Sequence, residues 1–201
     1  MKKVILFSLL SLAVFGLSAQ TKIGVTTGLV LASVSTNDAD LKSEKSMLLA
    51  PQFGLTVDHA LSKSLSLQSQ LLFIGKGTSI KHLDHKDKVR FSALDIPIQL
   101  VYRTKGGWFI GGGPNLGFNL SVKSIDEDGS EPIDIGSAVG EVKGFDMGLN
   151  FRTGVELKGG LVLSVNKLFG LTNLQNVSGF RWNNNAIGLN VGYFLPKKAK
   201  K

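Results

Sequence analysis

The sequence predicts an all-β fold, an eight-stranded antiparallel up-and-down transmembrane β-barrel of the outer-membrane type. Three observations predict it. Eight segments show the two-residue alternation of strands that have one apolar face. The connections between these segments alternate between long and short, as in barrels with long external loops and short periplasmic turns. The face opposite the large aliphatic side chains is rich in glycine and asparagine, whereas a soluble ligand-binding barrel turns its large apolar side chains inward.

The chain is organised around a hairpin that runs from Phe91 to Val122. Its two strands are longer than average soluble strands and suit a tilted membrane crossing, and Gly106 and Gly107 turn the chain between them. The apolar side chains at even-numbered positions, which extend as far as Val122, form one face of the hairpin. The hairpin residues predicted to face lipid are Leu94, Ile96, Ile98, Leu100, Tyr102, Trp108, Leu116 and Phe118.

Three strands precede this hairpin, and each carries large aliphatic side chains at alternate positions. They are predicted at about residues 22–33, 49–58 and 65–76. A polar stretch at residues 35–46 separates the first strand from the second, whereas only residues 62–64 separate the second from the third. We expect a second charged loop from Ser79 to Arg90, before the hairpin begins.

Three strands follow the hairpin and complete the predicted eight. They are predicted at about residues 145–157, 161–166 and 187–193. Their predicted lipid-facing side chains are Phe145, Met147, Leu149, Phe151, Leu189, Val191 and Tyr193. An acidic loop at residues 126–134 precedes this group, Lys158-Gly159-Gly160 turns its first hairpin, and a loop from Thr172 to Asn185 leads to the last strand. An even number of strands places both termini on the periplasmic side.

The two ends of the chain are expected to lie outside the barrel domain. Residues 1–19 have the basic start, the apolar stretch and the small residues of a secretory signal peptide, cleaved after Ala19. An uncleaved membrane helix is the weaker alternative, because the apolar stretch is shorter than the roughly 20 residues that a span needs. The barrel domain is then residues 20–196, and residues 197–201 are a basic tail that is solvated or touches anionic headgroups.

Charge and cysteine content exclude several classes of protein. The formal net charge is +8, but only +2 remains on residues 20–196 when the lysines of the signal peptide and of the tail are set aside. A nucleic-acid-binding domain would carry its basic residues clustered on the folded body, so we expect no nucleic-acid partner. The chain has no cysteine, which excludes disulfides, cysteine-ligated metals and a lipid-bearing cysteine after the signal peptide.

Charged side chains lie on the face that carries small and polar residues, so they should point into the lumen. They are Asp58, Lys76, Asp95, Arg103, Asp146, Arg152 and Glu156. Charges in so narrow an interior must be paired or hydrated. We therefore predict two ionic clusters that hold the barrel closed, one near the external ends of the strands with Lys76 and Asp95, and one near the periplasmic ends. A proton or ion path is the alternative.

The interior of an eight-stranded barrel is only wide enough for side chains to fill, so we expect a plugged lumen. The abundance of glycine and asparagine on the inner face also predicts that no packed hydrophobic core lies there.

No pattern in the chain predicts a catalytic, cofactor or metal site. The pair His82-x-x-His85, with acidic neighbours, offers too few converging ligands for zinc, and the acidic run at residues 126–128 lacks the distal glutamate of a calcium loop. Outer-membrane barrel enzymes place a serine and a histidine at the outer rim, but the histidine outside that pair, His59, lies near the periplasmic end. We therefore predict that the protein is not an enzyme.

Four short motifs carry a resemblance to a known family. They are Asp95-Ile96-Pro97, Lys76-Gly77, Gly111-Gly112-Gly113-Pro114 and Gly170-Leu171-Thr172-Asn173. The mature chain resembles the outer-membrane β-barrel domain that is common in Bacteroidota and is often called PorT-like. The resemblance implies an outer-membrane location and mostly no assigned activity, although one branch assists type IX secretion.

The C-terminus departs from the usual ending of such barrels. They commonly finish on an aromatic residue that the barrel-assembly machinery reads, whereas here Phe194 is followed by Leu195, Pro196 and the lysine tail. Gly188 and Tyr193 keep the spacing of that signal, so we still expect the machinery to recognise the chain.

The sequence therefore indicates a monomeric barrel of a Gram-negative outer membrane. We expect a structural or surface-interaction role through four external loops, with a role in secretion implied by the resemblance. The expected partners are outer-membrane lipid, the barrel-assembly machinery and an extracellular or secretion-system protein. Two alternatives stay open at this point, a small ion or solute channel and a soluble exported lipocalin-like binding protein.

Overall fold

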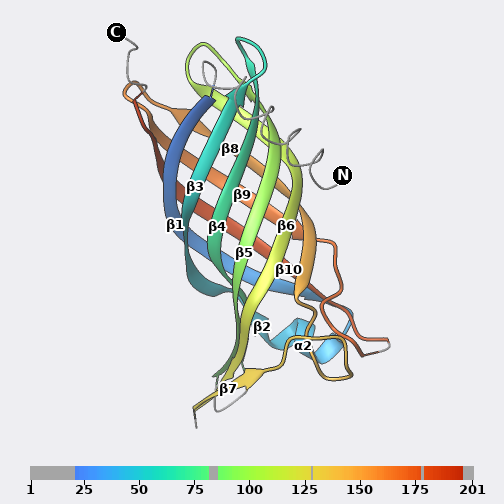
Figure 1. Cartoon of the computed structure of the whole chain (residues 1–201). Helices are drawn as coiled ribbons and strands as arrows, with labels where there is room; N and C mark the ends of the chain where they lie inside the picture. The colour runs from blue at the N-terminus through green and yellow to red at the C-terminus, as the bar shows by residue number, and fades with distance from the viewer. Residues whose placement is uncertain (1–20, 82–85, 128, 178, 197–201) are drawn as a thin grey trace, which may run out of the picture.

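The computed structural model describes residues 21–81, 86–127, 129–177 and 179–196 (Figure 1). The predicted signal peptide, the lysine tail and the side chains of His82, Asp84 and His85 lie outside the described residues.

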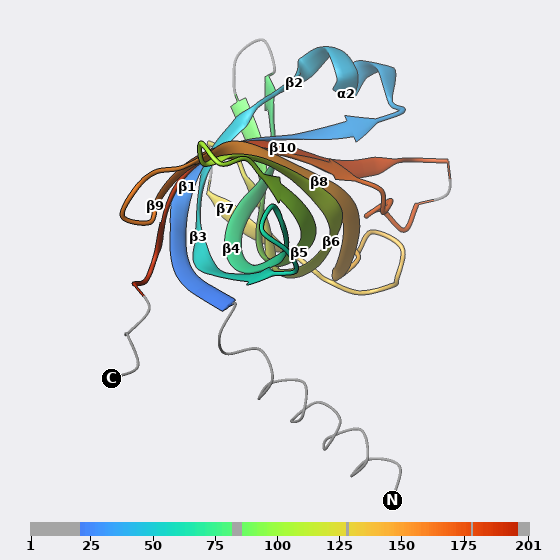
Figure 2. The same ribbon diagram turned by 90° about the horizontal axis from the view of Figure 1, so that it is seen from above.

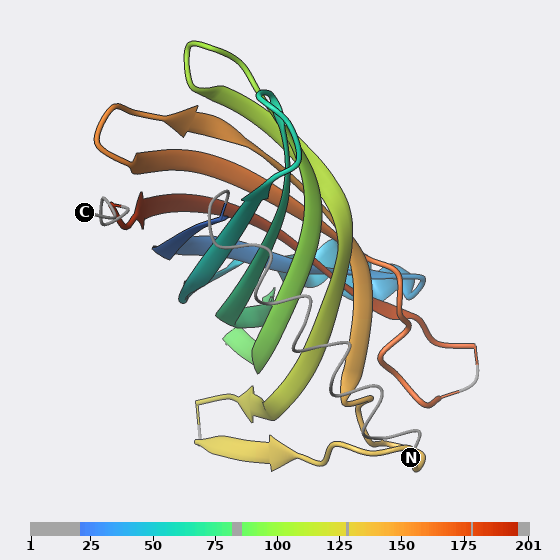
Figure 3. The same ribbon diagram turned by 45° about the horizontal axis from the view of Figure 1, so that its top comes forward.

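Eight long strands close into a barrel. They are β1 (Thr21–Thr36), β3 (Leu48–Ala60), β4 (Leu65–Lys81), β5 (Lys86–Arg103), β6 (Trp108–Ile125), β8 (Phe145–Glu156), β9 (Leu161–Gly170) and β10 (Trp182–Phe194). Each pairs antiparallel with the long strand before it and the one after it, and pairing of β1 with β10 from Gly24–Phe194 to Thr36–Trp182 closes the ring. The ring is seen end-on in Figure 2, and the tilt of its strands in Figure 3. The predicted up-and-down eight-stranded barrel is confirmed.

Three short turns lie at the end of the barrel where β1 begins and β10 ends (Figure 1). They are residues 61–64, 104–107 and 157–160. In the second turn the Thr104 amide donates to the carbonyl of Trp108 at 2.8 Å. Gly107 has a φ of +87°, a left-handed conformation that a side chain would strain. The short connections of the sequence prediction are therefore all on this end.

Smaller elements extend the opposite end. The helix α2 (Ala39–Glu44) begins at Asp38, whose Oδ1 accepts from the amide of Leu41 at 2.9 Å. The short strand β2 (Lys45–Ser46) pairs with β4, and β7 (Ser130–Ile133) pairs with β6. Figure 1 shows α2, β2 and β7 together at the end of the barrel opposite the three short turns.

Each of the four predicted loops is partly strand, and β2 and β7 lie in two of them. The expected loop from Ser79 to Arg90 is wrong for most of its length, because β4 and β5 stay paired out to Lys81 and Lys86. β-branched residues continue the strand pattern here, and charged side chains are tolerated on a hairpin that projects beyond the barrel. The last strand likewise starts at Trp182, several residues earlier than predicted.

A β-bulge reverses the direction in which side chains point near the C-terminal end of β6, which is the end predicted to be external. Ser92 pairs with Ser121 but Ala93 pairs with Asn119, so Leu120 is the extra residue. Val122 consequently points inward and is only 2% exposed. Its predicted place at the end of the outer apolar face is wrong, because one inserted residue moves every later side chain to the other face.

The sequence analysis predicted that no packed hydrophobic core lies in the lumen. This prediction is wrong, because apolar side chains form clusters there. A cluster at the end with the short turns, named periplasmic after the predicted orientation, consists of Val101, Phe109, Val162 and Phe194. A central cluster consists of Val30, Ala32, Leu48, Ile74, Ala93, Leu168 and Ala186. An external cluster consists of Val34, Phe91, Val122, Val142, Leu174 and Trp182. The prediction failed because glycines on some strands leave the room that large side chains from other strands fill.

Candidate functional site

The site that the fold builds is the barrel interior, where charged and amide side chains from many strands meet. Its external ionic cluster consists of Lys76 from β4, Asp95 from β5 and Asp146 from β8. The Nζ of Lys76, which is 0% exposed, lies 2.8 Å from Oδ1 of Asp95 and 3.3 Å from Oδ2 of Asp146. Asn115 donates to Asp95 at 2.9 Å, and Asn184 donates to Asp146 at 3.1 Å. Two carboxylates thus share one buried ammonium across the lumen.

Gly117 on β6 makes room for this cluster. A Cβ atom at that position would lie 2.9 Å from Oδ1 of Asp95 and 3.1 Å from the Nζ of Lys76. Any larger residue would therefore push the ion pair apart. This explains why β6 carries glycine here, although glycine weakens the interior of a strand.

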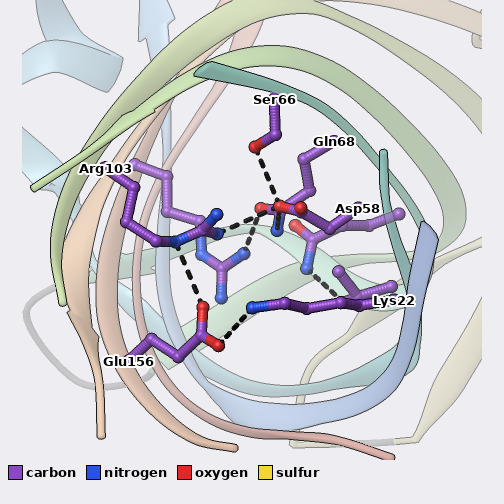
Figure 4. Close-up of polar contacts among 9 residues, drawn as sticks. Lys22, Asp58, Ser66, Gln68, Arg103 and Glu156 are labelled. Atoms are coloured by element: carbon purple, nitrogen blue, oxygen red, sulfur yellow. Dashed lines mark hydrogen bonds and ion pairs between the residues drawn. The ribbon is translucent and has the colours of Figure 1, made fainter. Parts of the chain in front are cut away.

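The periplasmic ionic cluster consists of Lys22, Asp58, Arg103 and Glu156 (Figure 4). Arg103 lies 3.0 Å from Oδ2 of Asp58 and 3.1 Å from Oε2 of Glu156, and Lys22 lies 2.5 Å from the other oxygen of Glu156. Positive and negative side chains therefore alternate in the order Lys22, Glu156, Arg103 and Asp58. Each carboxylate oxygen in these contacts faces a cation. Such a network ties β1, β3, β5 and β8 together.

Neutral and aromatic partners complete this cluster. Ser66 and Gln68 both donate to Asp58 at 3.0 Å. The buried Arg152 donates to Oε1 of Gln68 at 2.7 Å and to Ser164 at 3.0 Å. Its guanidinium also lies 5.3 Å from the centre of the Phe109 ring, a distance at which the ring face attracts a cation.

A belt of amide side chains lies between the two ionic clusters. Gln99 donates to Oδ1 of Asn150 at 2.9 Å, and Asn190 donates to Oδ1 of Asn166 at 2.8 Å. Gln52 donates to Asn190 and joins β3 to this pair. One group of these hydrogen bonds joins β5 to β8 and the other joins β3, β9 and β10, so polar side chains fill the middle of the barrel.

All seven charged residues of the sequence prediction have side chains in the lumen, in two groups. Asp146 contributes to the external cluster, and Arg152 joins the periplasmic group through Gln68 rather than through a carboxylate in hydrogen-bond contact. Sequence reasoning missed Lys22 and Phe109. Both have the parity of the inner face of their strands, Lys22 with Gly24 and Phe109 with Gly111, so the alternation alone could have found them.

The predicted lipid-facing side chains all point away from the lumen. Most are exposed, for example Leu100 at 50%, Trp108 at 63% and Leu189 at 64%. Leu94, Ile96 and Leu116 are half-buried. The surface of the barrel is thus apolar over its full circumference.

The described residues contain no group of three or more histidine, cysteine or acidic side chains that could hold a metal ion. Within the same part of the chain, no helix is long and apolar enough to cross a membrane.

The sequence matches a known protein family. Residues 18–176 match the family described as outer membrane protein beta-barrel domain. A search of curated proteins finds no match.

Solved structures of small bacterial barrels are similar in outline. Ail, the attachment invasion locus protein of Yersinia pestis, is 12% identical with a TM-score of 0.49, and the match covers 88% of this chain and 99% of that one. For OprG from Pseudomonas aeruginosa the identity is 12%, the TM-score 0.49 and the coverage 89% and 97%. For neisserial surface protein A the values are 12%, 0.48, 86% and 96%.

Proposed function

Because the chain belongs to the outer membrane protein β-barrel domain family, we propose that it is a closed barrel that acts at the cell surface through its external loops. The protein is an outer-membrane β-barrel, and its surroundings are lipid. The proposal concerns what the barrel does there, namely that its lumen conducts no solute and that its external end is the interaction surface.

The observation that best supports a closed lumen is the burial of Lys76 between two carboxylates. An ammonium that is 0% exposed has no contact with a water-filled path, and its ion pairs bridge β4 to β5 and β8. The external apolar cluster lies beyond it toward the loops, and the amide belt, periplasmic ionic cluster and Phe109 lie on its other side. A conducting channel needs a continuous wet path, which this succession of layers interrupts.

The external loops are tied to one another by hydrogen bonds and to the mouth of the barrel by apolar contacts. Val142 and Leu174, from different loops, are both buried with Trp182 in the external apolar cluster. Asn176 donates to the carbonyls of Gly136 and Glu141, both at 3.1 Å. An ordered loop surface can recognise a partner without first losing much conformational entropy, which supports an interaction role.

The outward apolar side chains are proposed to contact lipid, and the short turns to lie in the periplasm. The predicted signal peptide and the barrel-assembly machinery would deliver the chain, as a monomer, to this membrane. The PorT-like resemblance keeps a secretion-system protein among the proposed partners of the loops. The soluble lipocalin-like alternative is set aside, since the family places the protein in the outer membrane.

The test uses the absence of cysteine from the chain. A Val139→Cys variant places a thiol at an external loop position that is 83% exposed, and Lys63→Cys places one in a periplasmic turn. Both are treated on intact cells with a membrane-impermeant maleimide that carries a photocrosslinker. We expect Val139→Cys to be labelled and to form a discrete crosslinked product with another protein. Labelling of Lys63→Cys alone would reverse the proposed orientation, and labelled Val139→Cys without any product would argue against an interaction role.

A further inference from the structure

A polar groove of about 490 Å³ lies on the outer surface of the barrel near the external ends of β1, β9 and β10. We call it the rim groove. It is lined by Ser35, Phe169, Asn183 and Asn185 from these strands and by the cations Lys42 and Arg181. The contacts described above for the lumen do not involve it.

The rim groove marks the height at which the outer face of the barrel changes from apolar to polar. Along β10 the outward side chains are Leu189, Ile187, Asn185 and Asn183 in order toward the external end, and the first two are exposed aliphatics. In a membrane such a change marks the boundary between the hydrocarbon core and the headgroups. With the short turns in the periplasm, this boundary belongs to the outer leaflet.

The charge of the rim groove is positive. None of the described residues that line it is acidic, and the side chains of Lys42 and Arg181 have no hydrogen-bond or ion-pair partner among the described residues. Lys167, an outward-facing residue of β9, lies below the groove, with its Nζ 5.1 Å from the centre of the Phe169 ring. A lysine on the lipid face extends its ammonium toward the interface, so a third cation points to the same place.

The groove is held in shape by hydrogen bonds that leave its cations free. Asn37 donates to the carbonyl of Gly179 at 2.6 Å, and its Oδ1 accepts from the amide of Arg181 at 2.8 Å, which fixes the backbone that carries the guanidinium. Asn185 donates to Oγ of Ser35 at 2.8 Å. The side chain of Asn183 is 8% exposed and has no hydrogen bond to any described residue, so its amide is available to a ligand in the groove.

We propose that the rim groove binds a phosphate group on the headgroup of an outer-leaflet lipid. Arginine and lysine are the side chains that recognise phosphate, and the amide of Asn183 offers a further donor. A lipid is favoured over a free anion because Phe169 and the exposed aliphatics below the groove would contact the acyl chains of the same molecule. The inference rests on the proposed orientation but not on the interaction role of the loops.

The test is native mass spectrometry of the folded barrel, released from detergent after incubation with phosphatidic acid. A Lys42→Gln, Arg181→Gln double variant removes two positive charges from the groove. If each cation near the surface contributes about 1 kcal/mol, retention of the lipid should fall on the order of 10- to 30-fold. The matched control is Arg90→Gln, Lys123→Gln, which removes the same charge from the paired ends of β5 and β6 and should retain the lipid as the wild type does.

Two further arms identify the ligand. Diacylglycerol with the same acyl chains should be retained far less than phosphatidic acid, and millimolar inorganic phosphate should compete weakly. Equal retention of diacylglycerol, or an undiminished double variant, would overturn the proposal. Complete competition by inorganic phosphate would also contradict it, since the groove would then be a site for a free anion. Heat-dependent gel mobility shows that each variant is folded before it is compared.

Discussion

Replacing Lys76 by methionine should destabilise the barrel more than any comparable change of one lysine. The side chain is 0% exposed and is the cation that contacts both Asp95 and Asp146. Methionine fills a similar volume without the charge, so the variant leaves two buried carboxylates facing each other. They must then repel or take up a proton, and either outcome disfavours the folded barrel.

The expected magnitude follows from the burial of all three groups. Removing one partner of a buried ion pair costs about 3–5 kcal/mol, and two orphaned carboxylates put Lys76→Met at the upper part of that range. With a urea dependence of roughly 2 kcal/mol per molar, the unfolding midpoint should fall by about 2–2.5 M. Lys63→Met, at an exposed turn position, should change the free energy of unfolding by about 0.5 kcal/mol or less.

The assay is urea titration of the barrel folded in lipid vesicles, read from the gel mobility of unboiled samples. A triple variant, Lys76→Met with Asp95→Asn and Asp146→Asn, tests the cause, because it removes the orphaned charges while keeping the shapes. It should recover most of the lost stability. The reasoning fails if Lys76→Met unfolds at the wild-type urea concentration, or if the triple variant is no more stable than the single one.

Three further changes probe other parts of the barrel. Leu189→Arg, at an outward side chain that is 64% exposed, should lower the free energy of unfolding in vesicles by about 2–4 kcal/mol, whereas Val139→Arg in a loop should not. Equal urea midpoints for the two variants would show that Leu189 does not face lipid. Phe194→Ala should cost about 3–5 kcal/mol, because the ring is 7% exposed and fills the periplasmic cluster, and an unchanged midpoint would show that its cavity refills. Gly117→Ala should cost about 1–3 kcal/mol by displacing Lys76 and Asp95, and a neutral result would show that the ion pair has room to shift.

Much of the fold could be predicted because a strand with one apolar face has a period of two. That period separates Asp146 from Met147 and Arg152 from Phe151 without any structure, and it orders eight such strands along the chain. Antiparallel pairing of sequence neighbours then requires no further information once the turns are located. The short turns were found because serine, glycine and lysine interrupt the alternation there.

The rest could not be predicted because it depends on contacts between distant strands. The bulge at Leu120 inverts Val122, and the sequence around it reads as an unbroken alternation. Which strand fills the space beside a glycine of another strand is likewise set by the shear of the closed ring, so the contacts of Phe109 with Val101, Val162 and Phe194 could not be predicted from the alternation of single strands. The projecting hairpin was taken for a loop because charged residues outside the membrane obscure the apolar face on which the prediction depends.

The central claim, that the lumen is closed, is tested most directly by recording single channels from the purified barrel in planar bilayers. The wild type should show no steady conductance, and neither should Arg152→Ala, because the external ionic cluster and the apolar clusters still fill the lumen. A steady wild-type conductance that Arg152→Ala alters would contradict the claim, and the small channel would then be the better description of this protein.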